Sequence, residues 1–314
     1  ILEYLTSGIT TNFDMYLNPE AIVKASLDMK YRTVLCGAVN DFCLSVEDVE
    51  RCFNEYNQEN SLISYVLGFS HEYTNSKEKI QQVAALSHKY KAPVYTHLSE
   101  TEYEVNTCKE KTGRSPVEYL CDLGVYDYGG GAFHCVHMSE HDLDLFKEKH
   151  LNIVTNPASN LKLASGIAPI QAMLQKKINI CLGTDGPASN NCLDMFREMF
   201  LVTGLAKYKN CDASAVDAYK VLKMATVNGA KALNLNCGVL EAGKLADLII
   251  LDLYQPNMQP MNNIAKNIVY SGSKSNVKCT MVNGEILYED GHFYVGFEIE
   301  ALYDEIQKRV ERLK

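Results

Sequence analysis

Four polar residues stand where short apolar runs end: His97 and Glu100 in YTHLSE, His134 in FHCVH and Asp185 in LGTDG. A neutral imidazole is a common zinc ligand, and a carboxylate can carry a proton between a water and a substrate. An aspartate at a strand end can bind a metal and also accept a proton from the water on it. These residue types therefore predict a hydrolytic metal site.

Each residue taken alone has an ordinary explanation, as a loop residue, a satisfied core histidine or an Asp-Gly turn. The regularity of the set favours a site. His71 in GFSHEYT ends one apolar run, and the runs that follow end in His97, His134 and Asp185. Only the run at 151–157 among them lacks such a residue. Independent surface residues would not recur so regularly.

Alternating strand and helix patterns would position these residues. The apolar runs predict strands at 9–14, 31–39, 62–70, 92–99, 130–137, 151–157 and 178–186. Helical patterns follow them at 19–30, 48–57, 76–90, 102–111, 116–123, 140–149, 168–176, 192–207 and 214–233. The first of these helices has Asn18 at its N-cap and Pro19 in its first turn.

Such alternation predicts an α/β protein with a parallel sheet and right-handed crossovers. Residues 1–8 have the pattern of a helix end, so we expect a (β/α)8 barrel whose first strand is absent from this chain. A doubly wound open sheet is the competing fold. It is disfavoured because no Gly-x-Gly-x-x-Gly follows a strand.

The pattern changes after residue 236. Residues 238–253 and 278–294 are typical of β-ribbons, and Asn283-Gly284 is a two-residue turn signal. An amphipathic helix is predicted at 297–313. We therefore predict two domains, a barrel at 1–236 and a small β subdomain with the C-terminal helix at 237–314.

Composition narrows the class of protein. The 314 residues are 46% hydrophobic and 22% charged, as in an ordinary globular protein, and the net charge is -9. An acidic balance argues against a nucleic-acid partner, which needs clustered Lys and Arg. Eleven scattered cysteines, with no long apolar span, predict reduced thiols in a cytoplasmic protein that has no membrane partner.

A long motif resembles a known family. The stretch HCVHMSEHDLDLFKEKHLNIVTNPASNLKLASGIAPIQAMLQKKINICLGTDGPASNNCLDMFREM is similar to the amidohydrolase superfamily. It looks most like the branch of 5′-methylthioadenosine/S-adenosylhomocysteine deaminases, which has chlorohydrolases and guanine deaminase as relatives. SGITTNFDM, HLSETEYEV and GKLADLIILDL fit as well, so the resemblance covers essentially the whole chain.

The resemblance implies a (β/α)8 barrel with one divalent metal, usually zinc, with Fe²⁺ as the alternative. By match to the family, His97 and Asp185 are the metal ligands, and Asp185 is also the base. Glu100 is the proton-carrying acid and contacts the substrate, His134 polarises the attacked centre or orients the water, and His71 contacts the substrate. The implied reaction is attack of metal-activated hydroxide on an amino-purine, with loss of ammonia.

Two departures from the family stand out. The family's other two ligands form a His-x-His on the first strand, and this chain contains no His-x-His. Thr155 stands where the family often has a histidine before Asn-Pro. The alternatives are therefore a chlorohydrolase, a guanine- or cytosine-type deaminase, a metal-independent barrel enzyme, and a metal-free truncated barrel with a structural or interaction role. The expected partners are a small-molecule substrate and, by resemblance, further copies of the chain.

Overall fold

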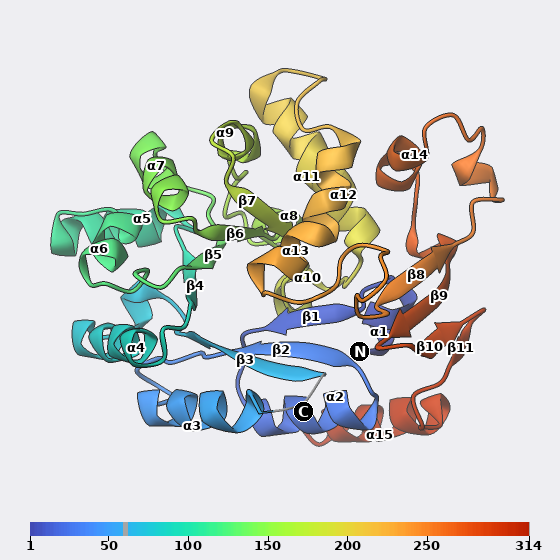
Figure 1. The fold of residues 1–314 in the computed structure, drawn as a ribbon, viewed down its shortest axis with the longest axis horizontal. Coiled ribbons are helices and arrows are strands. Elements are labelled where there is room, and N and C mark those ends of the chain that lie inside the picture. The colour runs from blue at the N-terminus through green and yellow to red at the C-terminus, as the bar shows by residue number, and fades with distance from the viewer. Residues whose placement is uncertain (59–61, 314) are drawn as a thin grey trace.

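Seven parallel strands lie side by side in chain order and form a curled half-barrel (Figure 1). The computed structural model describes residues 1–58 and 62–313. The strands of this sheet are β1 (Thr11–Asp14), β2 (Arg32–Cys36), β3 (Ile63–Gly68), β4 (Val94–Leu98), β5 (Gly130–His134), β6 (Asn152–Thr155) and β7 (Asn179–Leu182). Each pairs in parallel with the next.

This sequential order is that of a barrel. In a doubly wound open sheet the strand order reverses at a switch point, and the described strands show no reversal. The predicted α/β class with a parallel sheet is confirmed. That a further strand precedes β1 is tested by none of these observations and stays a prediction.

The helices lie around the two sheets, and most of them follow strands of the half-barrel (Figure 1). They are α1 (Leu2–Thr6), α2 (Pro19–Asp28), α3 (Val46–Tyr56), α4 (Lys77–Tyr90), α5 (Glu102–Thr112), α6 (Pro116–Asp122), α7 (Glu140–Glu148), α8 (Pro157–Lys162), α9 (Ile170–Gln175), α10 (Pro187–Asn190), α11 (Met195–Asn210), α12 (Ala218–Ala225), α13 (Val227–Ala232), α14 (Ile264–Tyr270) and α15 (Ile299–Glu311), with the short 3-10 helices η1 (Glu72–Thr74), η2 (Pro256–Met258) and η3 (Lys274–Asn276).

Side-chain caps fix where several helices begin. Ser45, Ser115 and Ser139 each accept the backbone N–H three residues on, and the acid there accepts the N–H of the serine. This reciprocal capping box starts α3, α6 and α7. Asn18 is at the expected N-cap of α2, but its φ is 57° and its side chain makes no hydrogen bond to the described first turn. Pro19, with its fixed φ, therefore starts that helix.

Aromatic side chains fill the inside of the half-barrel. The ring centroid of Phe13 lies 5.0 Å from that of Tyr95 and 5.3 Å from that of Phe133. Strands β4 and β5 approach closely at Gly130, where φ is 122° and an added Cβ would lie 2.0 Å from the carbonyl oxygen of Val94. Only glycine fits that position. The packed aromatics form a floor below the carboxyl ends of the strands.

A second, antiparallel sheet has the order β11-β10-β9-β8. Its strands are β8 (Leu248–Leu251), β9 (Val277–Val282), β10 (Glu285–Glu289) and β11 (His292–Phe293). The predicted turn between β9 and β10 is confirmed, with φ of 51° at Asn283 and 84° at Gly284.

The small sheet shares its buried core with segments of the half-barrel side. Leu5 and Tyr31, from before β2, share one buried cluster with Leu287 of β10. Helix α14 packs on α11 and α12 of the half-barrel side. Segments from both sides of residue 236 therefore share apolar cores, and the division at 236/237 stays a prediction.

Two predicted elements differ in the structure. The helix expected at 214–233 breaks at Thr226, where φ is -134° and ψ is -98°, giving α12 and α13. The Oγ1 of Thr226 donates a hydrogen bond to the carbonyl oxygen of Leu222 at 2.6 Å, which stabilises the break. The ribbon expected at 238–253 forms a strand only at β8, because its first part is taken up by turns and bends.

Two further observations concern the whole described chain. No helix within residues 1–58 and 62–313 is long and apolar enough to cross a membrane. All eleven cysteines are free thiols. Burial raises the pKa of the Cys36 and Cys135 thiols, which keeps both uncharged.

Candidate active site

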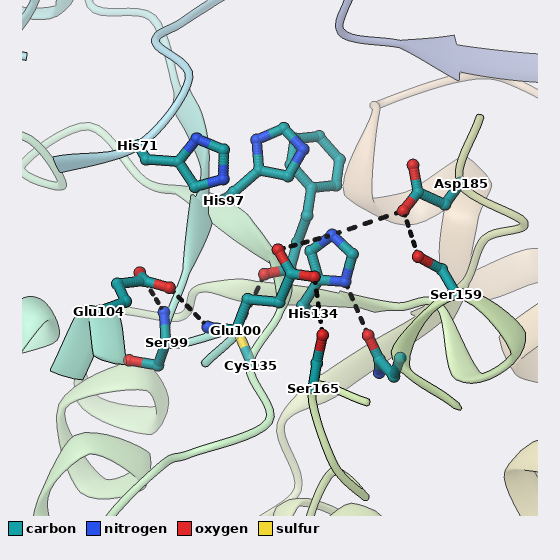
Figure 2. A network of polar contacts seen from close by, with 12 residues as sticks. His71, His97, Ser99, Glu100, Glu104, His134, Cys135, Ser159, Ser165 and Asp185 are labelled. Carbon is teal, nitrogen blue, oxygen red and sulfur yellow. Dashed lines mark hydrogen bonds and ion pairs between the residues drawn. The ribbon is translucent and has the colours of Figure 1, made fainter. Parts of the chain in front are cut away.

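The residues predicted to do chemistry gather at the carboxyl ends of the strands (Figure 2). His97 lies in β4 and His134 ends β5, while His71, Glu100 and Asp185 lie on the loops that follow β3, β4 and β7. Active sites of (β/α)8 barrels occupy this end of the sheet. The sequence expectation that these residues come from strand ends is met.

Two carboxylates converge on His134. Its Nε2 lies 3.8 Å from Oε2 of Glu100 and 3.9 Å from Oδ2 of Asp185. The side chain of His134 is 2% exposed, those of Glu100 and Asp185 only 14% and 21%. On the other side of the ring, the Nδ1–H donates to Oδ1 of Asn160 at 2.8 Å, which fixes the ring plane. The partly buried space around Nε2 is therefore negative and favours a cation or a proton donor.

A hydrogen bond at Nδ1 orients the ring of His97 and leaves Nε2 able to bind a metal. Its Nδ1–H donates to the carbonyl oxygen of Ser70 at 2.9 Å, which leaves the lone pair on Nε2. The ring stacks on His71 with centroids 4.5 Å apart, and its centroid lies 5.5 Å from that of His134. Burial, followed by repulsion from His134, lowers the pKa of His97 to about 4. A neutral imidazole of this kind is a good metal ligand.

Hydroxyl groups orient the two carboxylates. The Oγ of Ser159 donates to Oδ2 of Asp185 at 2.6 Å, and the N–H of Gly186 donates to Oδ1 at 2.6 Å. The Oγ of Ser165 donates to Oε1 of Glu100 at 3.0 Å. Both acids are therefore fixed in direction before any substrate arrives, as catalytic acids and bases need to be.

The backbone at these strand ends is strained. Ser99, His134, Cys135 and Asp185 all have φ between 51° and 69°, in the left-handed region that non-glycine residues rarely adopt. The N–H of Cys135 donates to the carbonyl oxygen of Phe133 at 3.0 Å, which closes a three-residue turn around His134. A γ-turn with positive φ is rare and costly. Strain of this kind concentrates at functional sites.

A third carboxylate, that of Glu198, links two segments of the site. Glu198 of α11 is fully buried, and it accepts the N–H of Ala158 at 2.9 Å and the side-chain amide of Asn190 at 2.8 Å. That amide also donates to the carbonyl oxygen of Thr184 at 2.6 Å. Burial raises the pKa of Glu198 to about 7. Glu198 thereby ties helix α8, which carries Ser159, to the loop that carries Asp185.

The donor set fits part of a metal site. His97 offers a neutral imidazole nitrogen and Asp185 a carboxylate, both types that zinc prefers. In the part of the chain that the structure describes, no group of three or more His, Cys, Asp and Glu is arranged to hold a metal ion. Since catalytic zinc takes three protein ligands, these two residues fall short of a complete set.

The comparison with family models gives a match over most of the chain. The model of the amidohydrolase family matches residues 1–287. The chain belongs to the amidohydrolase family. The resemblance stated from the sequence motifs is thus confirmed.

Curated amidohydrolase relatives are similar over the whole chain. A 5-methylthioadenosine/S-adenosylhomocysteine deaminase of Caldanaerobacter subterraneus subsp. tengcongensis is 38% identical over 100% of this chain and 74% of its own length. A 5'-deoxyadenosine deaminase of Methanocaldococcus jannaschii is 37% identical over 100% of this chain and 76% of its own length. The chain thus spans about three quarters of the relatives it matches.

A solved amidohydrolase structure shares the fold. An adenosine deaminase from Xanthomonas campestris, crystallised with bound zinc, superposes with a TM-score of 0.92 at 28% identity. The match covers 98% of this chain and 72% of that one. A metal-containing relative therefore has this half-barrel.

The acids and imidazoles named from the sequence lie together in the structure, but their hydrogen-bond partners were not predicted. The missed residues are Ser70, Ser159, Asn160, Ser165 and Glu198. A sequence signal existed only for Ser159 and Asn160, in the polar segment NPASN (156–160) at the end of the run at 151–157. Thr155, where the family often has histidine, is 1% exposed at the end of β6.

Proposed function

We propose that this protein is a metal-dependent hydrolytic deaminase of amino-purine nucleosides of the 5′-methylthioadenosine/S-adenosylhomocysteine type. One observation supports this most: Glu100 and Asp185 converge on Nε2 of His134 beside a neutral His97. Two oriented carboxylates and an imidazole can move the protons of a hydrolysis. The deaminase relatives, 37–38% identical over the whole chain, supply the reaction class.

The contacts of the acids give each a role. Asp185, fixed by Ser159, would accept a proton from the attacking water. Glu100, fixed by Ser165, would carry a proton to the ring nitrogen of the purine. The Nε2 of His134 lies between both acids and would orient the water or polarise the attacked carbon.

His97 and Asp185 would contribute two ligands to one divalent metal, zinc or alternatively Fe²⁺. When bound, such a metal lowers the pKa of a water toward about 7 and so supplies a nucleophile at neutral pH. The hydrogen bond from His97 to Ser70 sets the orientation of the imidazole before the metal arrives.

The reaction replaces the 6-amino group of the purine by the oxygen of water. The water oxygen forms a bond to C6 of the purine, and the bond from C6 to the amino nitrogen breaks. One water proton ends on the ring nitrogen N1, and the other leaves with the amino group as ammonia. The products are therefore a 6-oxopurine nucleoside and ammonia.

His71 is placed to contact the substrate rather than the reacting atoms. Burial, followed by repulsion from His97 and His134, lowers the pKa of His71 well below its ordinary value. Its Nδ1 lies 2.8 Å from the hydroxyl of Ser70. The uncharged ring of His71, which stacks on His97, can form one further hydrogen bond with a bound nucleoside.

The test is substrate profiling of the full-length, zinc-loaded protein. Ammonia release is measured with methylthioadenosine, S-adenosylhomocysteine, adenosine, guanine and cytosine, and chloride release with a chlorotriazine. Fastest ammonia release from the thioether nucleosides is the expected result. Fastest turnover of guanine, cytosine or the chlorotriazine would replace the substrate class, and no turnover of any of them would overturn the proposal.

A metal-free barrel with a structural or interaction role is the second candidate. It is favoured by the incomplete ligand set within the described residues. Zinc analysis of the full-length protein separates the two, because an enzyme of the proposed kind retains about one metal per chain. A cytoplasmic location and homo-oligomer formation stay predictions, the second to be checked by light scattering.

A further inference from the structure

A buried carboxylate on α5 holds the loop that carries Glu100. Glu104 is 1% exposed, and its Oε1 accepts the N–H of Ser99 at 2.6 Å. Its Oε2 accepts the N–H of Glu100 itself at 2.8 Å. Figure 2 shows this carboxylate facing the two successive backbone N–H groups. Hydrogen bonds to a charged acceptor are about twice as strong as neutral ones.

The hydrogen bonds of Glu104 differ from those of the corresponding acid in the next helix, α6. Glu104 is the third residue of α5, and its N–H donates to Oγ1 of the N-cap Thr101. In α6 the acid at the same position, Glu118, accepts the N–H of the N-cap Ser115, which is the usual capping box. The side chain of Glu104 instead reaches past the N-cap to the two residues before it. Its hydrogen bonds therefore serve the site loop in addition to the helix.

Ser99 also connects this loop to the loop that follows His134. Its carbonyl oxygen accepts the N–H of Val136 at 3.0 Å and that of His137 at 2.9 Å. Its own φ is 51°, a conformation that costs about 1 kcal/mol or more for a non-glycine residue. Because the N–H of Ser99 is held by Glu104, the strained peptide is fixed from both sides.

A second acid, Glu72 of η1, interacts with Glu104 and is 5% exposed. Burial and the charge of Glu104 raise the pKa of Glu72 to about 9. Burial raises the pKa of Glu104 as well, but the backbone N–H groups of Glu100 and Ser99 and the hydrogen bond with Glu72 lower it. Because Glu104 has these donors, the proton of the pair stays on Glu72 and the negative charge on Glu104. The N–H groups of Ser99 and Glu100 thus face an anion.

We infer that Glu104 is a positioning residue, which fixes the backbone of Ser99 and Glu100 and thereby the direction of the Glu100 side chain. The inference rests on the proposed function of Glu100. Glu104 itself touches neither the substrate nor the reacting atoms. The change Glu104→Gln leaves one acceptor oxygen and sets an amide NH2 against the other backbone N–H, so one of the two hydrogen bonds is lost.

The experiment compares Glu104→Gln with Glu118→Gln in the full-length protein. Glu118→Gln removes the corresponding acid from α6, so it controls for loss of a helix cap away from the site. For Glu104→Gln we expect kcat to fall roughly 10- to 100-fold with little change in KM or bound zinc, since small misplacements near the chemistry have such effects. For Glu118→Gln we expect kcat per folded chain to stay at the wild-type value.

A second measurement does not depend on activity. Amide hydrogen exchange of a peptide covering residues 98–103 should be slow in the wild type and at least roughly tenfold faster in Glu104→Gln. If Glu104→Gln does not fold, Glu104→Asp tests the same contact, because its carboxylate is one methylene too short to reach both N–H groups.

The outcomes separate the two proposals. Wild-type kcat and wild-type exchange in a folded Glu104→Gln, alongside inactivity of Glu100→Gln, would overturn the positioning role and leave the proposed function in place. No turnover by the wild type would overturn the proposed function, while the exchange measurement would still decide whether Glu104 fixes the loop. If Glu118→Gln lost as much kcat as Glu104→Gln, the effect would come from the loss of any helix cap, and the positioning role of Glu104 would be overturned.

Discussion

Arg32 and Asp247 form a two-point ion pair that is almost fully shielded from water. Their side chains are 2% and 1% exposed. The Nε of Arg32 donates to Oδ2 of Asp247 at 2.5 Å, and its Nη2 donates to Oδ1 at 3.0 Å. The same Oδ1 accepts the N–H of Asn283 at 2.7 Å. One carboxylate therefore links the start of β2 in the half-barrel to the turn of the small sheet.

Removing one partner of this pair should strongly destabilise the fold. Arg32→Met leaves Asp247 buried without its cation, so we expect the free energy of unfolding to fall by about 3–5 kcal/mol in urea titrations. The double change Arg32→Met with Asp247→Leu should recover much of that loss, because no uncompensated charge remains. Arg51→Met, on exposed α3, is the matched control and should change little. A double variant no more stable than Arg32→Met would contradict this reading of the pair.

Loss of Asp185 should remove activity, and loss of its partner should weaken it. Asp185→Ala is expected to lower kcat at least roughly 1000-fold, as for loss of a general base. Ser159→Ala keeps the carboxylate of Asp185 but removes a hydrogen bond that orients it, so kcat is expected to fall roughly 10-fold. Asp127→Asn, on an exposed turn, serves as the control. Steady-state ammonia release measures all three, and near-normal turnover by Asp185→Ala would sink the assignment.

Zinc retention should depend on His97. His97→Ala removes a neutral imidazole that is already oriented by Ser70, so bound zinc should fall at least roughly tenfold, since even loss of a ligand's orienting partner has effects of this size. His141→Ala, on the exposed face of α7, should leave zinc unchanged. Plasma emission analysis of the dialysed full-length proteins gives the comparison. Equal zinc in both variants would place the metal elsewhere.

The raised pKa of Glu72 predicts a pH-dependent stability. The folded value is about 9, while the unfolded value is near the ordinary 4.5. Between these values the folded chain holds a proton that the unfolded chain has released, so this acid lowers stability progressively as pH rises toward about 9. Glu72→Gln has no titratable group at this position. The difference in free energy of unfolding, Glu72→Gln minus wild type, should therefore increase between about pH 5 and about pH 9.

Thermal or urea unfolding at several pH values measures this difference. Glu78→Gln, in the exposed first turn of α4, controls for the loss of a carboxyl. A difference between Glu72→Gln and the wild type that is independent of pH would show that Glu72 ionises normally in the fold.

The βα alternation could be predicted because it depends on local patterns. Each apolar run of the half-barrel became a strand, and positive φ at Asn283 and Gly284 confirmed a two-residue turn signal. The break at Thr226 could not be predicted, because the apolar pattern continues through it. The helix breaks there because the hydroxyl of Thr226 donates a hydrogen bond to the carbonyl oxygen of Leu222 in the preceding turn.

That these acids and imidazoles come together could be predicted, because their types and strand-end positions are visible in the sequence. Their partners could not. Ser165 lies 65 residues from Glu100, and Asn160 lies 26 residues from His134. Ser and Asn are common in any loop, so only the folded sheet shows which of them meet a carboxylate or an imidazole. Glu104 has the position of an ordinary helix cap, which hides its contact with the site loop.

The left-handed backbone at Ser99 opposes thermal stability to catalytic precision in any laboratory selection. Glycine at this position would relieve strain of about 1 kcal/mol. A library screened for thermal survival alone would therefore favour glycine there. The same glycine would widen the range of directions open to Glu100, so a screen that rewards turnover as well should keep the serine.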